Sequence, residues 1–171
     1  MNIEARVGTE GDVRTLVELY RACREALAGE RGGGVHVLTA AFADPLEPHF
    51  RAMVHDDRKL VLLGTIDDVA VGLGVARLEE TSESACLATV EALYVDPSAR
   101  EVGVGETLLA ELTDWATKSG AIGVDVPVLP GMRTAKNFLE GSGFAARLLV
   151  MHRQLARSQA PRQTGESGVD N

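Results

Sequence analysis

The sequence predicts an α+β protein built around a mixed sheet. Apolar residues alternate with polar ones in some segments and recur at helical spacing in others. Glycine, proline and paired acidic residues separate these segments and indicate the turns. The resulting order is one strand, two helices, three strands, and then helix, strand, helix and strand. Strands followed by a second half of βα units are typical of an α+β architecture.

The first half of the chain begins with a strand and an amphipathic helix. Ile3, Ala5 and Val7 alternate with polar residues and predict the strand. The capping-box sequence Thr9-Glu10-Gly11-Asp12 opens the helix, whose apolar residues recur to about Ala28. A glycine-rich loop over residues 29–34 is expected to be mobile. Residues 38–55 predict a weaker helical region, interrupted by its two prolines, Pro45 and Pro48.

The remaining elements follow a regular plan. Three extended segments predict an antiparallel meander: 59–66, 69–78 and 85–95. Residues 104–119 have the clearest amphipathic helical pattern in the chain, and Gly120 ends that helix. Later segments predict a buried strand, a short helix and a last strand: 121–128, 133–140 and 144–155. We expect one domain over residues 1–156 and a disordered polar tail over 157–171.

Composition narrows the class of protein. The chain has 171 residues, of which 45% are hydrophobic and 25% charged, as in a globular domain. A net charge of −8 argues against nucleic-acid binding, which normally requires a basic surface. The acidity favours solubility first and a cationic partner, such as an amine, second. Cys23 and Cys86 occupy apolar positions and are expected to be reduced core residues. Without a signal-peptide or membrane-spanning pattern, the sequence predicts a cytoplasmic protein.

The turn between the third strand of the meander and the amphipathic helix is the candidate ligand site. It reads Arg100-Glu101-Val102-Gly103-Val104-Gly105, and the helix begins inside it. Free backbone N–H groups at a helix N-terminus bind anions, and glycines allow close approach to the backbone. A dinucleotide fingerprint would need a third glycine at Leu108, and a P-loop would need Gly-Lys-Ser/Thr, which the chain lacks. The six residues alone leave open a plain strand-to-helix turn.

Two segments resemble the GCN5-related N-acetyltransferase (GNAT) family. The strand end Leu93-Tyr94-Val95-Asp96-Pro97, the glycine loop and the following helix resemble its acetyl-CoA-binding segment. The stretch 135–144, AKNFLEGSGF, is similar to its A-x-x-F-Y-E-x-x-G-F segment. The element order agrees over residues 2–155. The resemblance implies the GNAT fold, a mixed, mostly antiparallel sheet that is splayed between strands 4 and 5 and has helices on both faces.

The resemblance also implies a cofactor and a reaction. Acetyl-CoA would lie where the strands 85–95 and 121–128 separate, its pantetheine arm paired with main chain near Leu93 and Val95. A deprotonated amine would attack the thioester directly, without a covalent enzyme intermediate or a metal. The cofactor-binding residues would be these: Leu93, Tyr94, Val95, Arg100, Glu101, Val102, Gly103, Val104, Gly105, Glu106 and Phe138. Homodimers are common in the family, although the sequence itself leaves the oligomeric state open.

Catalytic groups are less well defined. Many relatives have a tyrosine acid where this chain has Leu139, and an asparagine where it has Met132. Tyr94 is the better-placed replacement acid. Glu91 and Asp125 are the candidate bases, because a carboxylate in an apolar strand needs a partner or a wet cleft.

The alternative for both carboxylates is a structural arginine or solvent. Glu91, the first choice, shares the strand parity of Leu93 and Val95. His36 and His49 lie in the region that lines the acceptor pocket in this family, and histidine spacing fits no metal motif.

Two functional hypotheses follow. The first is an acetyl-CoA-dependent N-acetyltransferase acting on a primary amine of a small molecule or peptide. The alternative, motivated by Leu139 and Met132, is a non-catalytic acyl-CoA-binding or regulatory module on the same fold.

Overall fold

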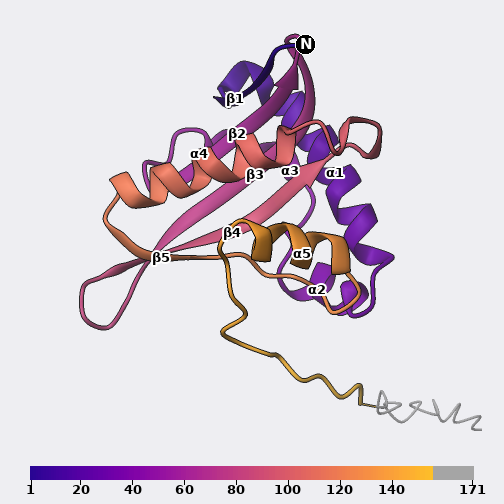
Figure 1. Cartoon of the computed structure of the whole chain (residues 1–171), viewed down its shortest axis with the longest axis vertical. Coiled ribbons are helices and arrows are strands. Elements are labelled where there is room, and N and C mark those ends of the chain that lie inside the picture. The colour runs from indigo at the N-terminus through magenta and orange to yellow at the C-terminus, as the bar shows by residue number, and fades with distance from the viewer. Residues whose placement is uncertain (156–171) are drawn as a thin grey trace, which may run out of the picture.

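A five-stranded mixed sheet forms the centre of the protein (Figure 1). This computed structural model describes residues 1–155, so the predicted tail over 157–171 lies outside the described residues. The strands pair in chain order, antiparallel up to the fourth, whereas the fourth and fifth are parallel. Their bounds are β1 (Ile3–Val7), β2 (Lys59–Ile66), β3 (Val69–Glu80), β4 (Cys86–Val95) and β5 (Ala121–Asp125). The predicted meander is therefore confirmed.

Helices cover both faces of this sheet (Figure 1). The five α-helices are α1 (Val13–Ala28), α2 (Gly33–Thr39), α3 (Leu46–Met53), α4 (Val104–Lys118) and α5 (Arg133–Gly141). Short 3₁₀ turns precede two of them, η1 (Glu10–Asp12) and η2 (Pro97–Ala99). One apolar core lies between the sheet and the helices α1 and α3, and a second lies between the sheet and α4. The predicted α+β fold with helices on both faces is confirmed.

The helix α1 follows its sequence pattern closely. Its buried residues repeat at helical spacing and face the first core: Val13, Leu16, Val17, Tyr20 and Cys23. Burial raises the pKa of the Cys23 thiol to about 11, so this residue stays protonated and packs as a small apolar group. The other cysteine, Cys86, is half-buried.

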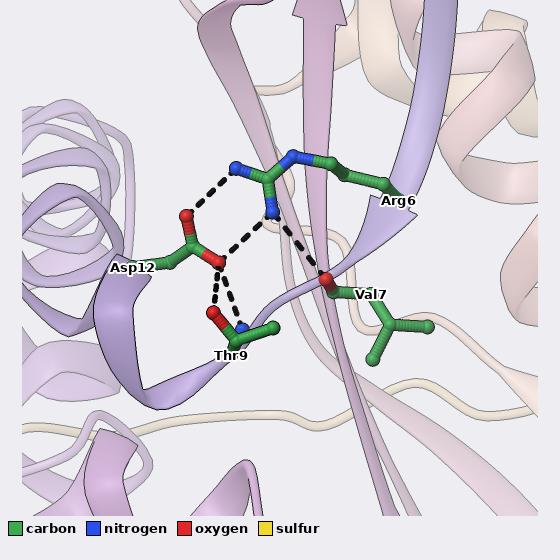
Figure 2. A network of polar contacts seen from close by, with 4 residues as sticks. All are labelled: Arg6, Val7, Thr9 and Asp12. Carbon is green, nitrogen blue, oxygen red and sulfur yellow. Dashed lines mark hydrogen bonds and ion pairs between the residues drawn. The ribbon is translucent and has the colours of Figure 1, made fainter.

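A charged network fastens β1 to the start of α1 (Figure 2). Arg6 donates two hydrogen bonds to the Asp12 carboxylate, at 2.7 and 2.9 Å. The Thr9 N–H and hydroxyl donate to the same carboxylate at 2.9 and 2.7 Å, completing the predicted capping box. With these four donors, the pKa of Asp12 lies well below its usual range, the Arg6 hydrogen bond being the main cause.

The helix α4 lies close against the opposite face. Its buried residues include Val104, Leu108 and Leu112, and it contacts all five strands. Glycines on the sheet make the close approach possible, because a Cβ at Gly64 would lie 2.7 Å from Val104 Cγ1 and 3.0 Å from Leu108 Cδ1.

Three sequence expectations need correction. The expected loop over residues 29–34 ends at Gly33, where α2 begins. The weak helical region becomes α3, and Pro48 does not interrupt it, because Pro48 stands in the first turn, where its missing N–H has no intrahelical partner to lose. The strand expected at 121–128 ends at Asp125, and residues 126–132 form a loop.

The strand expected over residues 144–155 does not form in the described structure. These residues are extended away from the sheet and belong to no ladder. Apolar side chains there are exposed, with Leu149 at 84% and Met151 at 89%. A strand needs a partner for its backbone groups, and this segment has none among residues 1–155. No helix in residues 1–155 is both long and apolar enough to cross a membrane.

Candidate active site

The parallel pair β4 and β5 separates partway along its length. Pairing runs from Cys86 with Ala121 to Thr89 with Asp125, where β5 ends. The strand β4 continues to Val95, still paired with β3 on its other side. Residues 90–95 therefore present an edge with no strand beside it, which confirms the predicted splay.

The hydrogen-bond phase decides which backbone groups face the splay. The Asp96 N–H donates to the Val71 carbonyl at 2.8 Å, so this opposed pair is a hydrogen-bonded one. Hydrogen-bonded and non-hydrogen-bonded pairs alternate along an antiparallel ladder, so the N–H and C=O groups of Leu93 and Val95 point away from β3. Arg100 Nε donates to the Val95 carbonyl at 3.1 Å, as this direction requires.

The turn after β4 brings backbone N–H groups together at the start of α4. Gly103 is the N-cap residue with φ of +106°, a conformation that residues with a Cβ rarely adopt. The Thr107 N–H donates to the Gly103 carbonyl at 3.0 Å. The preceding N–H groups, of Val104, Gly105 and Glu106, belong to the first turn and have no intrahelical acceptor. The helix dipole makes this end a favourable place for an anion.

Charged side chains around this turn have mixed signs. Arg100, Glu101 and Glu106 are all exposed, and Glu101 takes a positive φ of 65°. Asp96 accepts hydrogen bonds from the Ser98 N–H and hydroxyl at 2.8 and 2.5 Å, which fixes the 3₁₀ turn η2 and lowers the pKa of Asp96. The two glutamates would have to point outward from a bound anion.

Phe138 comes to this turn from α5. A Cβ added at Gly105 would lie 3.8 Å from Phe138 Cζ and 3.8 Å from Val95 Cγ2. The two segments that the sequence singled out, 93–105 and 135–144, therefore meet here. The aromatic ring and the end of β4 form an apolar wall beside the free N–H groups.

A β-bulge places Glu91 on the opposite face from the one expected. The β3–β4 register passes from Val75 opposite Ala92 to Ala76 opposite Val90, so Glu91 is the extra residue. Leu93 and Val95 pack toward α4, but Glu91 forms ion pairs with Lys59 and Arg77.

Those two cations lie on the face that α1 and α3 cover. Lys59 is two residues from Val61 on β2, and Arg77 is two residues from Val75 on β3, so each points to the same face as a residue of that core. The predicted shared parity of Glu91 with Leu93 and Val95 was therefore wrong.

The Glu91 carboxylate is held unequally at its two oxygens. Arg77 Nε lies 2.9 Å from Oε1, whereas Lys59 Nζ lies 3.6 Å from Oε2. Oε2 is buried and has no hydrogen-bond partner within residues 1–155. A buried carboxylate oxygen without a donor is left with an unfilled hydrogen-bonding position.

A small cavity adjoins this ion pair through Lys59. It has a volume of about 290 Å³ and its lining includes Phe42, His49, Met53, Asp56 and Lys59. The Lys59 ammonium lies 5.7 Å from the centre of the Phe42 ring, and His49 stacks on that ring at 6.2 Å. The cavity thus combines an aromatic face with charged groups of both signs, Asp56 and Lys59. The other histidine of interest, His36, is half-buried on α2, outside this lining.

Asp125 is held by a different cation. Arg147 Nε donates to Asp125 Oδ1 at 2.7 Å, and the second guanidinium nitrogen contacts Oδ2. This bidentate pair lowers the pKa of Asp125. The carboxylate stands at the last position of β5, where the two parallel strands separate.

Tyr94 is buried, with 9% exposure, and packs in the core beneath α1. Burial raises its pKa, so the hydroxyl is protonated near neutral pH. Leu139 is also buried, and Met132 is the half-buried N-cap residue of α5. Neither has a side chain that can donate a proton.

Sequence reasoning missed the two cations around Glu91. Lys59 begins the apolar strand β2, and Arg77 follows the apolar run at the start of β3, which was the available signal. Charged residues at such positions need partners, and the meander places adjacent strands side by side. No group of three or more metal-ligating side chains within residues 1–155 is arranged to hold a metal ion.

Comparison with known proteins identifies the family. The pattern of the acetyltransferase (GNAT) family matches residues 14–144. The chain therefore belongs to the GNAT family, whose members use acetyl-CoA. Among curated proteins no sequence matches significantly.

Solved structures share this fold at low identity. An aminoglycoside acetyltransferase, meta-AAC0020, from an uncultured soil metagenomic sample, in complex with sisomicin, is 19% identical with a TM-score of 0.68, over 91% of this chain and 97% of that one. AAC(6')-Iy, in complex with a bisubstrate analog, CoA-S-monomethyl-acetylneamine, is 18% identical with a TM-score of 0.67, over 91% and 100%. A transcriptional regulator from Bacillus halodurans C-125 is 19% identical with a TM-score of 0.69, over 90% and 100%.

Proposed function

We propose that this protein transfers an acetyl group from acetyl-CoA to a primary amine of a small molecule or peptide. The observation that carries the proposal is the continuity of two features, the open backbone edge of β4 and the free N–H groups at the start of α4. The edge fits an extended amide chain and the helix start fits a pyrophosphate. Coenzyme A contains both groups next to each other, the pantetheine arm and the pyrophosphate to which it is joined.

The cofactor-binding residues would act through backbone as much as side chains. Leu93 and Val95 offer main-chain groups to the pantetheine arm, and residues 102–106 offer N–H groups to the pyrophosphate. Arg100 adds a positive charge beside them, and Phe138 shields the arm from water. When bound, acetyl-CoA supplies the thioester carbonyl carbon that the amine attacks.

Glu91 is the proposed base. Its Oε2 atom is buried and accepts no hydrogen bond within residues 1–155, although Lys59 Nζ lies 3.6 Å from it, and its strand forms one side of the splay. The amine nitrogen would form the new bond to carbon as its proton passes to Glu91, and the carbon–sulfur bond would break. The thiolate would then take a proton from the Tyr94 hydroxyl. Asp125 is the second candidate base, and its bidentate contact with Arg147 would have to open first.

The acceptor amine would approach from the side of α2 and α3. The cavity beside Phe42 supports this direction, because Lys59 both lines the cavity and forms an ion pair with Glu91. The aminoglycoside acetyltransferases among the structural neighbours act on amines too, at identities that compare the fold alone. We further propose that residues 1–156 form the catalytic domain and that the protein works in the cytoplasm.

A second candidate is a non-catalytic acyl-CoA-binding regulator. Leu139, buried where many relatives have a tyrosine, favours it, and one structural neighbour is a transcriptional regulator. Release of free thiol from acetyl-CoA over a panel of amines separates the two candidates. Cofactor binding without turnover on any amine would favour the regulator.

Binding itself is tested by thermal unfolding with and without acetyl-CoA. At a ligand concentration near 100 times Kd, stabilisation is about 2.7 kcal/mol, which corresponds to roughly 5–10 °C in Tm for a chain of this size. Gly103→Ala should remove most of this shift, because a Cβ at φ of +106° distorts the start of α4.

Gly120→Ala is the matched control. Gly120 also has a positive φ, +74°, beyond the other end of α4, and a Cβ there meets nothing within 4 Å. Both variants should lower Tm by themselves to a similar degree, and Gly120→Ala should keep the full ligand shift. No shift for the native chain at millimolar acetyl-CoA would refute acetyl-CoA binding.

A further inference from the structure

Lys59 belongs to two features of the structure at once. Its side chain lines the cavity of about 290 Å³ beside Phe42, and its ammonium forms an ion pair with Glu91 Oε2. An acceptor bound in this cavity would therefore contact Lys59, and Lys59 in turn contacts the proposed base.

The ion pair between Lys59 and Glu91 is loose. The 3.6 Å between Nζ and Oε2 is longer than a hydrogen bond. Oε2 is buried and accepts no hydrogen bond within residues 1–155, so an amine can reach it only after a neighbouring group moves. The Lys59 side chain is 25% exposed, and an ammonium can donate several hydrogen bonds. A guest in the cavity can therefore compete with Glu91 for Lys59.

The charge of Lys59 decides which guest competes. An amine is protonated at neutral pH before it reacts, so a plain amine in this cavity would face the like charge of Lys59. A guest that carries a carboxylate beside its amine reverses this interaction, because the carboxylate accepts charge-assisted hydrogen bonds from the ammonium. Asp56 also lines the cavity, but it is exposed and its Oδ1 already accepts a hydrogen bond from the Arg58 N–H at 2.9 Å.

The rest of the cavity suits a small apolar group. Its volume of about 290 Å³ is at the lower end of the range for ligand sites. His49 stacks on the Phe42 ring, which forms an aromatic wall. The apolar residues of the lining are Phe42, Pro48, Ala52 and Met53.

We propose that the acceptor is an α-amino acid with an apolar side chain, and that Lys59 binds its carboxylate. The amino group and the carboxylate of such a molecule are adjacent opposite charges, as are Glu91 and Lys59, so the two pairs are complementary. A carboxylate that draws the Lys59 ammonium toward the cavity leaves Glu91 Oε2 open to the amine. Lys59 is thus a specificity-determining residue. The choice of acceptor rests on the proposed acetyl transfer, whereas the carboxylate site does not.

Matched pairs of acceptors test the substrate class. L-leucine is compared with isopentylamine, and L-phenylalanine with phenethylamine, each amine being the amino acid without its carboxylate. The measurement is kcat/KM from thiol release. Because an amino acid and its amine differ in basicity, the decisive quantity is how a substitution changes the preference within a pair. Lys59→Met should lower the preference for the amino acid about 10-fold or more, and Lys59→Arg should retain it.

Lys118→Met is the matched control. It makes the same substitution at an exposed lysine that is ion-paired with Asp114 at the end of α4. This variant should keep the preference of the native chain. Circular dichroism and Tm establish that each variant is folded. A preference that Lys59→Met leaves unchanged would overturn the assignment of the acceptor.

Binding of isocaproate, which is leucine without its amine, tests the site independently of acetyl transfer. In calorimetric titration the native chain should bind isocaproate about 10-fold or more tightly than the neutral isocaproamide, and Lys59→Met should remove the difference. Equal binding of the two compounds by the native chain would overturn the carboxylate site. Carboxylate-dependent binding without turnover on any acceptor would support that site and refute acetyl transfer alone.

Discussion

At the scale of single residues, the local sequence pattern around Glu91 does not predict the face of the sheet on which its side chain lies or the residues with which it pairs. A carboxylate inside an apolar strand signals a partner or a wet cleft, and sequence alone could go no further. Its actual face depends on a bulge, and the bulge exists only in the register between β3 and β4. The partners Lys59 and Arg77 come from two other strands. Their identity follows from strand pairing, which no single segment specifies.

Glu91→Gln tests the assignment of the base. The variant keeps the shape of the side chain but cannot take a proton, so kcat should fall about 100-fold or more while the Kd for acetyl-CoA is unchanged. The measurements are steady-state kinetics with an accepted amine and calorimetric titration with acetyl-CoA. The substitution removes the negative charge between Lys59 and Arg77, which keep their positive charges. Tm should therefore be measured on the same sample to show that the variant is folded.

Asp125→Asn provides the matched comparison. It removes the other candidate carboxylate, which Arg147 holds through two contacts. If Glu91 is the base, Asp125→Asn should retain most of kcat and the pH profile of the native enzyme. Equal kinetics for Glu91→Gln and the native chain would remove Glu91 from the mechanism, and a large loss for Asp125→Asn alone would transfer the role.

At the scale of elements, α4 was predictable as a helix but not in its closeness to the sheet. Its apolar residues at helical spacing specify which face is buried. The distance to the sheet depends on glycines in β2 and β3, whose contacts with α4 are apparent only once the layers are assembled. That distance matters for function, because the start of α4 carries the N–H groups proposed to bind the pyrophosphate.

Gly64→Ala tests this packing. The added Cβ would lie 2.7 Å from Val104 Cγ1, so α4 has to shift away from the sheet at the end nearest its N-terminus. We expect a loss of about 1–3 kcal/mol in the free energy of unfolding, together with weaker acetyl-CoA binding. Urea denaturation and calorimetric titration measure the two effects.

Gly74→Ala is the graded control for the same packing. Its Cβ would meet Leu112 Cδ1 at 3.3 Å, farther along the helix and in a looser contact. It should cost less stability than Gly64→Ala and leave acetyl-CoA binding unchanged. If both variants bind acetyl-CoA as tightly as the native chain does, binding does not require the start of α4 to pack closely on the sheet.

The C-terminal segment is the element for which the sequence pattern and the described structure disagree. Its apolar composition predicted a strand, yet residues 144–155 belong to no ladder within the chain. The apolar pattern of a segment indicates which side chains it can bury, but it does not indicate which strand edge the segment pairs with.

At the scale of the whole molecule, sequence predicted the order of most elements, from β1 and α1 through the meander to α4, β5 and α5. These follow from periodicity and from turns, which are local properties. It did not predict the helix α2, whose Gly-Gly start gave only a loop signal, or the end of β5 at Asp125. Both depend on neighbouring layers. For the same reason the glycine turn proposed to bind the pyrophosphate was recognisable from sequence, and the Glu91 ion pairs were not.

The pH dependence of stability is also a property of the whole molecule, and Asp12 should dominate its acid side. Four hydrogen bonds hold the carboxylate in the folded chain, so its folded pKa is lower than the unfolded value of about 3.9. A group with a depressed folded pKa stabilises the protein above its unfolded pKa, and this contribution is lost as the pH falls toward the folded value. The hydrogen bond from Arg147 also lowers the pKa of Asp125, so this residue likewise stabilises the folded chain less as the pH falls.

Asp12→Asn should therefore lower the free energy of unfolding by about 2 kcal/mol at pH 7, with a difference from the native chain that shrinks below about pH 4. Urea denaturation at a series of pH values measures both curves. Asp114→Asn is the control, because the exposed ion pair of Asp114 with Lys118 should contribute about 0.5 kcal/mol or less at any pH. A gap between the Asp12→Asn and native curves that stays constant into acid would mean that the residue acts through shape, since only a charged carboxylate gives a gap that closes as it is protonated.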